Sequence, residues 1–201
     1  MNKIAKVEYE ALAVSRVLLE CALIVVSVVL GFLVSAWATH AREQQLGASV
    51  RRSIALEVAD NLKTMEAQAR RHYAAVAKLH GVQPIPGHTA FQTLFENLHG
   101  DMGAPMKREA WEAAVSSGAL RLLDPSLVER YSEIYADQER VYDDDGTWLK
   151  PMLYRPENFD PQQQAVALAT LTGGLTELAG NEAYMRDLYR KELPALQKAA
   201  R

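Results

Sequence analysis

Histidine is the first residue type to consider for chemistry, because imidazole binds zinc and transfers protons near neutral pH. Zinc binding requires several such ligands at a suitable spacing in the sequence. A helical zinc site needs two histidines four residues apart around a glutamate, or partner cysteines. The chain has one cysteine, Cys21, and its histidines are scattered: His40, His72, His80, His88 and His99. His80 and His99 each precede a glycine, which predicts a place at a helix C-terminus, facing the negative end of the helix dipole. We therefore expect no metal site.

Carboxylates and serines offer two further candidates for chemistry. The run Tyr142–Gly146 holds three aspartates that could attract a cation, but the alternating ligands and late glutamate of a calcium loop are missing. An exposed acidic helix end explains it better. Ser116-Ser117-Gly118 resembles a nucleophile turn in composition, yet it lacks a partner base and a strand-turn-helix setting, so a helix C-terminus explains it. Since no nucleotide-binding glycine motif occurs either, we expect no catalytic residue, no cofactor and no enzymatic activity.

Aromatic residues are a third group with a possible function. Trp111, Tyr131 and Tyr135, together with Tyr142 and Tyr154, could line a groove on the surface of a helical domain. Packing in the core is the other interpretation, and it is favoured because large aromatic side chains dominate protein cores. Trp111, Tyr131 and Tyr135 remain the candidates for an interaction surface.

A long apolar stretch near the N-terminus indicates that the chain is attached to a membrane. From Cys21 to Thr39 the chain has 19 residues without a charged side chain, and the apolar run begins at Val17 with Glu20 as its one charge. At about 1.5 Å per residue the 19 residues form a helix of about 28 Å, close to the hydrocarbon thickness of a bilayer. Leu18 lies at the start of this segment and Trp37 at its end, where an indole ring favours the membrane interface. We predict a transmembrane anchor over residues 17–39, after a short N-terminal tail of residues 1–16.

Two alternatives to an anchor are weighed. Ala36-Trp37-Ala38 resembles a signal-peptide cleavage site, but the apolar core is longer than that of a signal peptide. A buried helix of a soluble domain is the other alternative, and 19 uncharged residues are long for it.

Gly31 and Ser35 form a pair of small residues four apart that would let a second membrane helix approach.

The positive-inside rule does not decide the orientation of the anchor, because the same number of basic residues, three, stands on each side of it. They are Lys3, Lys6 and Arg16 before the segment, and Arg42, Arg51 and Arg52 after it. The usual topology of a short N-terminal tail before a signal anchor places the C-terminal domain outside the cytoplasm. We adopt that orientation as the expectation.

The rest of the chain is expected to be helical throughout. Apolar residues recur at steps of three and four across residues 40–80, which predicts an amphipathic helix next to the membrane that ends at His80-Gly81. Residues 81–201 are expected to form a helical domain that packs on it. Within this domain we predict helices over residues 91–98 and 108–117, and helices that start at Asp124-Pro125 and Asp160-Pro161. The helix after Asp124-Pro125 should end before a loop bounded by Pro151 and Pro156, the next should stop at Gly173-Gly174, and the last, over residues 181–198, should be kinked or shortened by Pro194.

Charge is distributed unevenly along this part. Residues 41–80 carry seven basic and four acidic side chains, whereas residues 81–201 carry 12 basic and 18 acidic ones. An acidic distal part argues against nucleic acid as a partner. The lipid bilayer is the partner expected from the anchor.

Two stretches carry a family resemblance: the anchor from Leu18 to Trp37, and the motif A-W-x-x-A-x-x-S-G-A-L that begins at Ala110 and continues to Tyr131. Their order and spacing over residues 15–142 resemble a family of uncharacterised bacterial proteins with one N-terminal membrane helix and a helical domain of unknown function. The resemblance implies an all-α domain and a bacterial inner-membrane location, and it implies no particular activity.

The fold class expected from all of this is all-α, with an N-terminal transmembrane helix that continues into a helical-bundle domain outside the membrane. The leading functional hypothesis is a membrane-anchored, non-enzymatic protein that binds another membrane or envelope protein, or a second copy of itself. The alternative is a sensory or small-ligand-binding helical bundle, since a bundle can hold a pocket between its helices.

Overall fold

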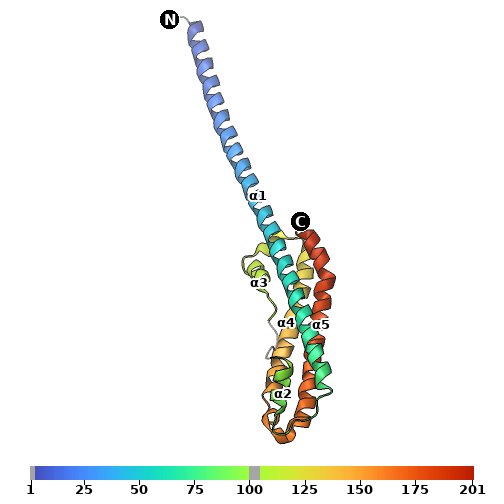
Figure 1. Cartoon of the computed structure of the whole chain (residues 1–201). Coiled ribbons are helices and arrows are strands. Elements are labelled where there is room, and N and C mark those ends of the chain that lie inside the picture. Colours follow the sequence, from blue (N-terminus) through green and yellow to red (C-terminus); the bar gives the residue numbers. More distant parts are fainter. Residues whose placement is uncertain (1–2, 100–104) are drawn as a thin grey trace. The chain divides into compact units, whose positions relative to one another are not determined.

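The computed structural model describes residues 3–99 and 105–201, and the side chains among them apart from those of residues 3–19, 21 and 142–146. All regular structure in these two ranges is helical, so the all-α expectation is confirmed. Figure 1 labels the α-helices α1 to α5. Their bounds are Lys3–Leu79 for α1, Ala90–Asn97 for α2, Glu109–Ser116 for α3, Pro125–Leu153 for α4 and Gln164–Ala199 for α5.

The chain divides into two compact units, residues 1–46 and residues 47–201. The first unit consists of the N-terminal part of α1, which carries the apolar stretch. The second unit holds the remaining part of α1, from Gly47 to Leu79, and all later elements. Residues 40–79, for which an amphipathic helix is predicted, are helical as part of α1.

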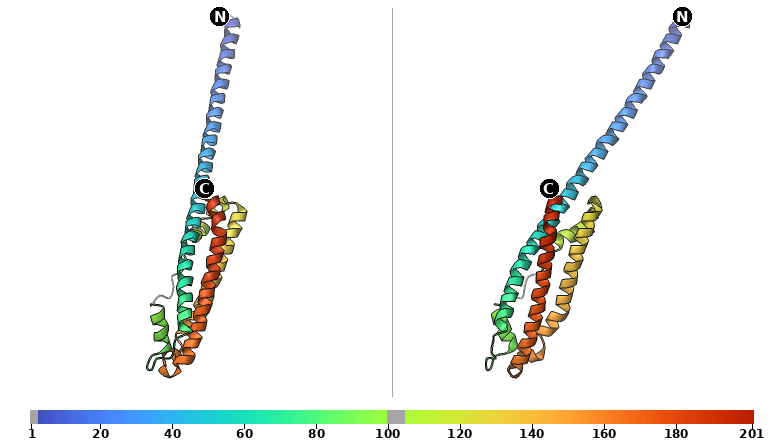
Figure 2. Two further views of the ribbon diagram at one scale, coloured as in Figure 1. Left: turned by 45° about the vertical axis from the view of Figure 1, so that its right-hand side comes forward. Right: turned by 90° about the vertical axis from the view of Figure 1, so that its right-hand side faces the viewer.

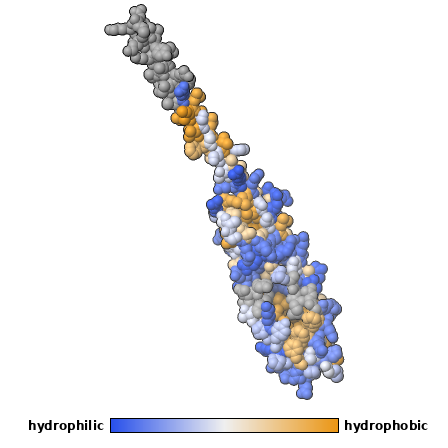
Figure 3. Space-filling view, turned by 90° about the vertical axis from the view of Figure 1, so that its left-hand side faces the viewer, coloured by the Kyte–Doolittle hydropathy of each residue, from blue (hydrophilic) through white to orange (hydrophobic). Residues whose placement is uncertain are grey.

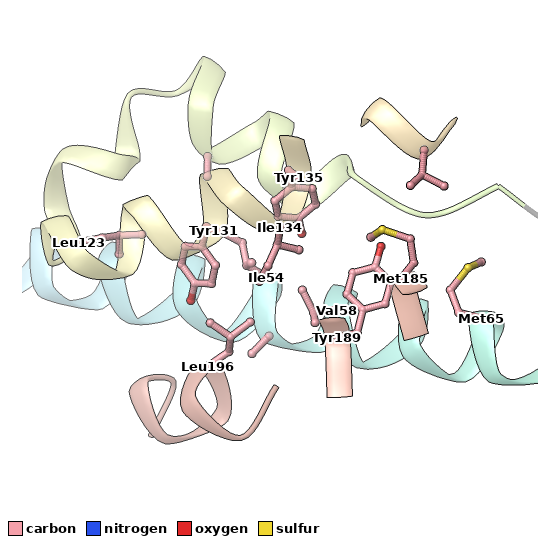
Figure 4. Packing of buried hydrophobic residues seen from close by; sticks show 13 residues of the cluster. Ile54, Val58, Met65, Leu123, Tyr131, Ile134, Tyr135, Met185, Tyr189 and Leu196 are labelled. Carbon is pink, nitrogen blue, oxygen red and sulfur yellow. The ribbon is translucent and has the colours of Figure 1, made fainter. Parts of the chain in front are cut away.

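The second unit is built on three long helices, namely α4, α5 and the part of α1 within this unit. Both views of Figure 2 show the three lying side by side. One buried cluster joins all three, with Ile54 and Val58 from α1, Tyr131 and Ile134 from α4, and Met185 and Tyr189 from α5 (Figure 4). A second cluster, around Val76, Leu94 and Leu171, attaches the short helix α2 to the far ends of α1 and α5.

Local start and stop signals in the sequence set several helix ends. The Asp124 side chain accepts a hydrogen bond from the Ser126 backbone N–H, and Pro125 occupies the first turn of α4. Thr89 and Gln92 form a reciprocal capping box at the start of α2. Gly118, with φ of 67°, follows the end of α3 in the left-handed region that favours glycine. The predicted start at Asp124-Pro125 and the predicted end at Gly118 are confirmed. Asp160-Pro161 starts a short 3-10 turn, Pro161–Gln163, and α5 itself begins at Gln164.

Two predicted helix ends are wrong, at Pro151 and at Gly173-Gly174, and α5 is not shortened at Pro194. The helix α4 continues through Pro151 to Leu153, and α5 runs unbroken through Gly173-Gly174 and Pro194. Both prolines are exposed, so the carbonyl groups they leave without a helical partner can bond water. Gly174 is buried against Met152 and Trp148 of α4, and its lack of a side chain lets the two helices approach closely. Packing between long helices thus outweighs the local preference of these residues.

Candidate functional site

The apolar segment of α1 is exposed along its length. Ten large apolar side chains between Leu23 and Val34 are 50–72% exposed, and Trp37 is 73% exposed. Among the described residues, α1 is the one helix long and apolar enough to cross a membrane. On the face drawn in Figure 3, most of this part of α1 is hydrophobic, with paler patches between. The alternative of a buried core helix does not fit this chain, because a core helix would have most of these side chains covered.

The remaining residues predicted for the anchor lie within the same helix. Gly31 and Ser35 are exposed, and a Cβ atom added at Gly31 would have no neighbour within 4 Å. This surface is therefore open to a second helix. Leu18 belongs to α1, but its side chain lies outside those that the structure describes.

Of the three aromatic candidates for an interaction surface, the structure buries two. Tyr131 is 0% and Tyr135 3% exposed. Tyr131 lies beside Leu196 of α5 (Figure 4), whereas Tyr135 is covered by Glu57 of α1 and Trp111 of α3. Their assignment to a surface is wrong, and the core interpretation holds for them. Trp111, on α3, is half-buried and stacks on Tyr135 with ring centroids 5.0 Å apart. Tyr154 is 70% exposed, away from this cluster.

A buried carboxylate lies next to these rings. The Glu57 side chain, on α1, is 7% exposed and accepts a hydrogen bond of 2.5 Å from the Tyr135 hydroxyl. It also accepts the backbone N–H groups of Ala110 at 2.7 Å and Trp111 at 3.4 Å. These two N–H groups belong to the first turn of α3. The N–H groups of a first turn have no acceptor within their own helix. Glu57 therefore caps α3 from another helix, and its negative charge favours the positive end of the α3 dipole.

Amide side chains extend this network along the same helices. Asn61 exchanges two hydrogen bonds of 2.8 Å with the backbone of Lys107, and the Gln138 amide donates to the same Lys107 carbonyl at 3.0 Å. The Tyr189 hydroxyl, on α5, donates to the Gln138 carbonyl oxygen at 2.8 Å. We call this set of residues the polar seam: Glu57, Asn61, Tyr135, Gln138 and Tyr189.

The polar seam holds the backbone that precedes α3 through the N–H and carbonyl groups of Lys107. Burial raises the pKa of both Tyr135 and Tyr189 above the ordinary value of 10.0, and for Tyr135 the hydrogen bond to Glu57 raises it further. Both hydroxyls are therefore neutral donors at physiological pH. Because these contacts are buried or part-buried and join residues of the chain to one another, the geometry assigns the seam to fixing the connection between α1, α3, α4 and α5.

A second buried pair lies further along the bundle. His72 Nδ1, on α1, is 2.8 Å from Glu182 Oε2, on α5, and His72 is 0% exposed. The other ring nitrogen, Nε2, is buried without a hydrogen-bond partner in the described structure. The pair joins two helices inside the bundle, where a dissolved substrate does not reach it.

The other residues considered for chemistry are not brought together. His80 follows the end of α1 and His99 follows the C-cap of α2, as predicted, and Ser116-Ser117-Gly118 ends α3. The side chains of Tyr142–Gly146 lie outside those described, but their backbone lies within α4, so the predicted helix end at this run is wrong. Among the described side chains, no group of three metal-ligating residues gathers.

An exposed aromatic patch was missed from the sequence. Phe91 stacks on Phe95 within α2, with centroids 5.8 Å apart, and on Phe159 of the short turn Pro156–Phe159, at 4.9 Å. Phe95 and Phe159 are each 45% exposed. The spacing of Phe91 and Phe95 by four residues predicts a contact on one helix face, but nothing local predicts that Phe159 joins them. We call these three residues the phenylalanine patch.

The described residues of the second unit line at least two hollows. One, of about 330 Å³, is lined by Leu79, His80 and Pro84 on one side and by Ala165, Ala169 and Gly173 of α5 on the other. The second, of about 370 Å³, lies between α1, the start of α4 and the end of α5. Its lining residues, which we call the Arg51 pocket, are Arg51, Asp124, Ser126, Leu127 and Ala199.

Comparisons with protein-family models, curated proteins and solved structures find no match for this chain.

Proposed function

We propose that this chain is a single-pass protein of the bacterial inner membrane whose helical domain binds another envelope protein, or a second copy of itself, without catalysing a reaction. Residues 17–39 form its anchor and residues 47–201 the interacting domain. The observation that carries the proposal is the exposure of ten large apolar side chains between Leu23 and Val34.

The energetics of that exposure favour a lipid environment. Fully burying a Val, Leu, Ile or Phe side chain contributes about 1.5–3 kcal/mol, so ten of them represent on the order of 15 kcal/mol or more. A helix that is apolar on all sides obtains this stabilisation in a bilayer, where its backbone groups are also paired internally. Trp37 follows the segment at the position where an interfacial indole is expected.

The phenylalanine patch supports protein binding by the domain. Exposed aromatic side chains in contact with one another are typical of the centres of interfaces. Glu96 and Glu157, both exposed, belong to the same two elements as the patch. A partner with an apolar surface flanked by basic residues fits this combination.

The proposed side of the membrane is the periplasm. Labelling of intact cells with a membrane-impermeant maleimide tests this, in a Cys21→Ser background with one new cysteine. Gln83 is a suitable position because it is exposed in the loop after α1, whereas Gly87 has φ of 82°, which strains other residues. A cysteine at Asn2 is the matched control on the other side of the anchor. Labelling of Gln83→Cys without lysis, and of Asn2→Cys after lysis, is expected; the reverse pattern would place the domain in the cytoplasm.

Binding through the phenylalanine patch is tested by photo-crosslinking in intact membranes. A benzoylphenylalanine at Phe95 should give a discrete adduct, to a second copy or to another protein. The control is the same residue at Val115, which is 50% exposed on α3 and outside the patch. Absence of an adduct at Phe95, or the same adducts at both positions, contradicts a specific interface at the patch.

A further inference from the structure

The phenylalanine patch lies at the end of the second unit where α1 ends. Buried residues of the last α1 turns, Val76 and Leu79 among them, belong to one cluster with Leu94 of α2. Both views of Figure 2 show α2 at the same end of the unit as these turns. The patch and α1 residues 70–79 are therefore at the same level along the bundle.

The outer face of α1 at this level is basic. Its exposed residues recur at steps of three and four, opposite the buried Val76 and Leu79. We call them the basic face: Arg70, Ala74, Ala77 and Lys78. Neither Arg70 nor Lys78 has an ion-pair partner among the described residues. Glu66, one turn before Arg70, pairs instead with Arg190 of α5 at 2.6 Å.

Charges of the opposite sign flank the phenylalanine patch. Glu96 and Glu157 are exposed on the two elements that carry the patch, and neither has an ion-pair partner in the part of the chain that the structure describes. Arg155 and Asp160, at the two ends of the Pro156–Phe159 turn, offset each other in charge. The surroundings of the patch therefore remain acidic.

The two surfaces also match in size and chemistry. From Arg70 to Lys78 the basic face extends over about 12 Å of helix. The three rings of the patch follow one another at centroid distances of 5.8 and 4.9 Å. Small alanine side chains let rings pack closely on a helix, and a guanidinium is attracted to an aromatic face. Carboxylates beside the rings would then meet the cations of the basic face.

Attachment to one membrane restricts how two copies can meet. Each chain enters the second unit at Gly47, shortly after the predicted anchor, so this end of the unit is tethered in every copy. Two tethered copies lie parallel, and surfaces at the same level along α1 can face each other. Contact between two phenylalanine patches would bring Glu96 and Glu157 against the same carboxylates of the second copy, and such like charges repel.

From this combination we infer that copies of the chain associate side by side in the membrane, with the phenylalanine patch of one copy on the basic face of the next. The inference rests on the proposed function, and it names the partner and both surfaces. The interface joins two different surfaces, so each copy keeps one of each kind for a further neighbour. Rotation about the membrane normal keeps the levels equal, and such an interface forms a ring where the rotation closes.

Crosslinking between two tagged forms of the full chain tests the inference. Both forms carry Cys21→Ser and are produced together in one cell. One form has Phe95→Cys and the other Ala74→Cys, and isolated membranes are treated with a short bis-maleimide. A dimer that carries both tags is expected, at several times the yield obtained when Val115→Cys replaces Ala74→Cys. Val115 is the matched control because it is 50% exposed on α3, outside both surfaces.

Charge reversal separates a specific contact from crowding in the membrane. Glu96→Lys, added to the form with Phe95→Cys, should reduce the mixed dimer about fivefold, because one attraction becomes a repulsion. Arg70→Glu, added to the other form, should restore it. Arg52→Glu, at an exposed basic residue of α1 nearer the anchor, is the matched control and should not restore it. Benzoylphenylalanine at Ala74, which leaves the patch intact, should give a self-adduct even if Phe95→Cys weakens the contact.

The outcomes distinguish this inference from the proposed function. A mixed dimer no stronger than the Val115 control, a stronger dimer with Phe95→Cys on both forms, or no recovery with Arg70→Glu would overturn the inference. A Phe95 adduct to another protein alone would do the same and leave the proposed envelope interaction standing. Release of the unchanged chain from the membrane by alkaline carbonate would instead overturn the proposed anchor.

Discussion

At the scale of single residues, Glu57 is the side chain with the most demanding set of contacts. Its carboxylate accepts hydrogen bonds from Tyr135, Ala110 and Trp111 while it is 7% exposed. A charged acceptor shared by three donors compensates for its own desolvation. One carboxylate from α1 therefore fixes both the start of α3 and the position of Tyr135 on α4.

Replacing Glu57 should destabilise the domain more than replacing its tyrosine partner does. We expect Glu57→Gln to lower the free energy of unfolding by about 2 kcal/mol, because a neutral amide accepts these bonds more weakly and brings an unpaired N–H₂ group. Tyr135→Phe, the matched control, should cost about 1 kcal/mol, since it removes one of the three bonds. Urea unfolding of the full chain in detergent, followed by circular dichroism, gives both values. Equal losses for the two variants would contradict the capping role of Glu57.

The sequence predicts where such residues lie better than what they do. The apolar steps of three and four along residues 50–79 predict the buried face of α1, and Glu57, Asn61 and His72 fall on that face. Their partners are 46 to 110 residues away in sequence, so no local pattern reveals them. The same holds for Tyr131 and Tyr135: their residue type favours a core, but it leaves an interface open until their neighbours are known.

At the scale of elements, the helix starts follow from local chemistry and the helix ends depend on packing. Aspartate followed by proline predicts the start of α4 because both residues act within one turn. Gly173-Gly174 predicts a break, yet α5 continues, since the exposed Gly173 costs little and the buried Gly174 lets α4 approach. The continuation of α5 through the two glycines therefore depends on its contacts with α4, which no local pattern reveals.

The start of α4 should depend on pH through Asp124. Its folded-state pKa lies below 3.8 because of the bonds from Ser126, so its stabilising contribution is fully present above that value and is lost as the pH falls through the folded pKa. Asp124→Ala should lower the thermal midpoint at pH 7 and reduce its decline between pH 5 and 3. Asp124→Asn retains the cap and should recover most of the midpoint at pH 7 without that acid dependence. Thermal unfolding at several pH values measures this, and an unchanged acid decline in both variants would contradict it.

The two adjacent glycines of α5 offer a matched pair of substitutions. Gly173→Ala should raise the free energy of unfolding by about 0.5–1 kcal/mol, because alanine favours a helix and its Cβ would have no neighbour within 4 Å. At Gly174 a Cβ would lie 2.2 Å from the Met152 methyl group and 3.1 Å from Trp148, so these side chains must shift. Gly174→Ala should therefore be less stable than Gly173→Ala by about 1–3 kcal/mol. Thermal or urea unfolding of both variants makes the comparison, and equal stabilities would show that α4 and α5 do not approach closely there.

At the scale of the whole molecule, the apolar part of α1 and the helical unit of residues 47–201 have different physical requirements. The unit of residues 47–201 buries its apolar side chains in two clusters of its own. The segment around Leu23–Val34 has its apolar side chains exposed, and a bilayer is the environment that stabilises such a helix. The sequence predicts this separation because an uncharged run of 19 residues can be recognised from residue types alone. No contact between distant residues has to be known for it.

Extraction of cell membranes with alkaline carbonate tests the anchor most directly. The unchanged chain should stay in the membrane pellet at its full, uncleaved mass. Val28→Asp combined with Phe32→Asp should release the protein into the supernatant, because each aspartate near the centre of a membrane helix costs about 2.5–3.5 kcal/mol. Leu56→Asp, at an apolar residue that is 61% exposed but outside the segment, is the matched control and should remain in the pellet. If carbonate released the unchanged chain, if its mass showed cleavage after Ala38, or if the double variant stayed in the membrane as firmly as the control, the segment would not be the anchor.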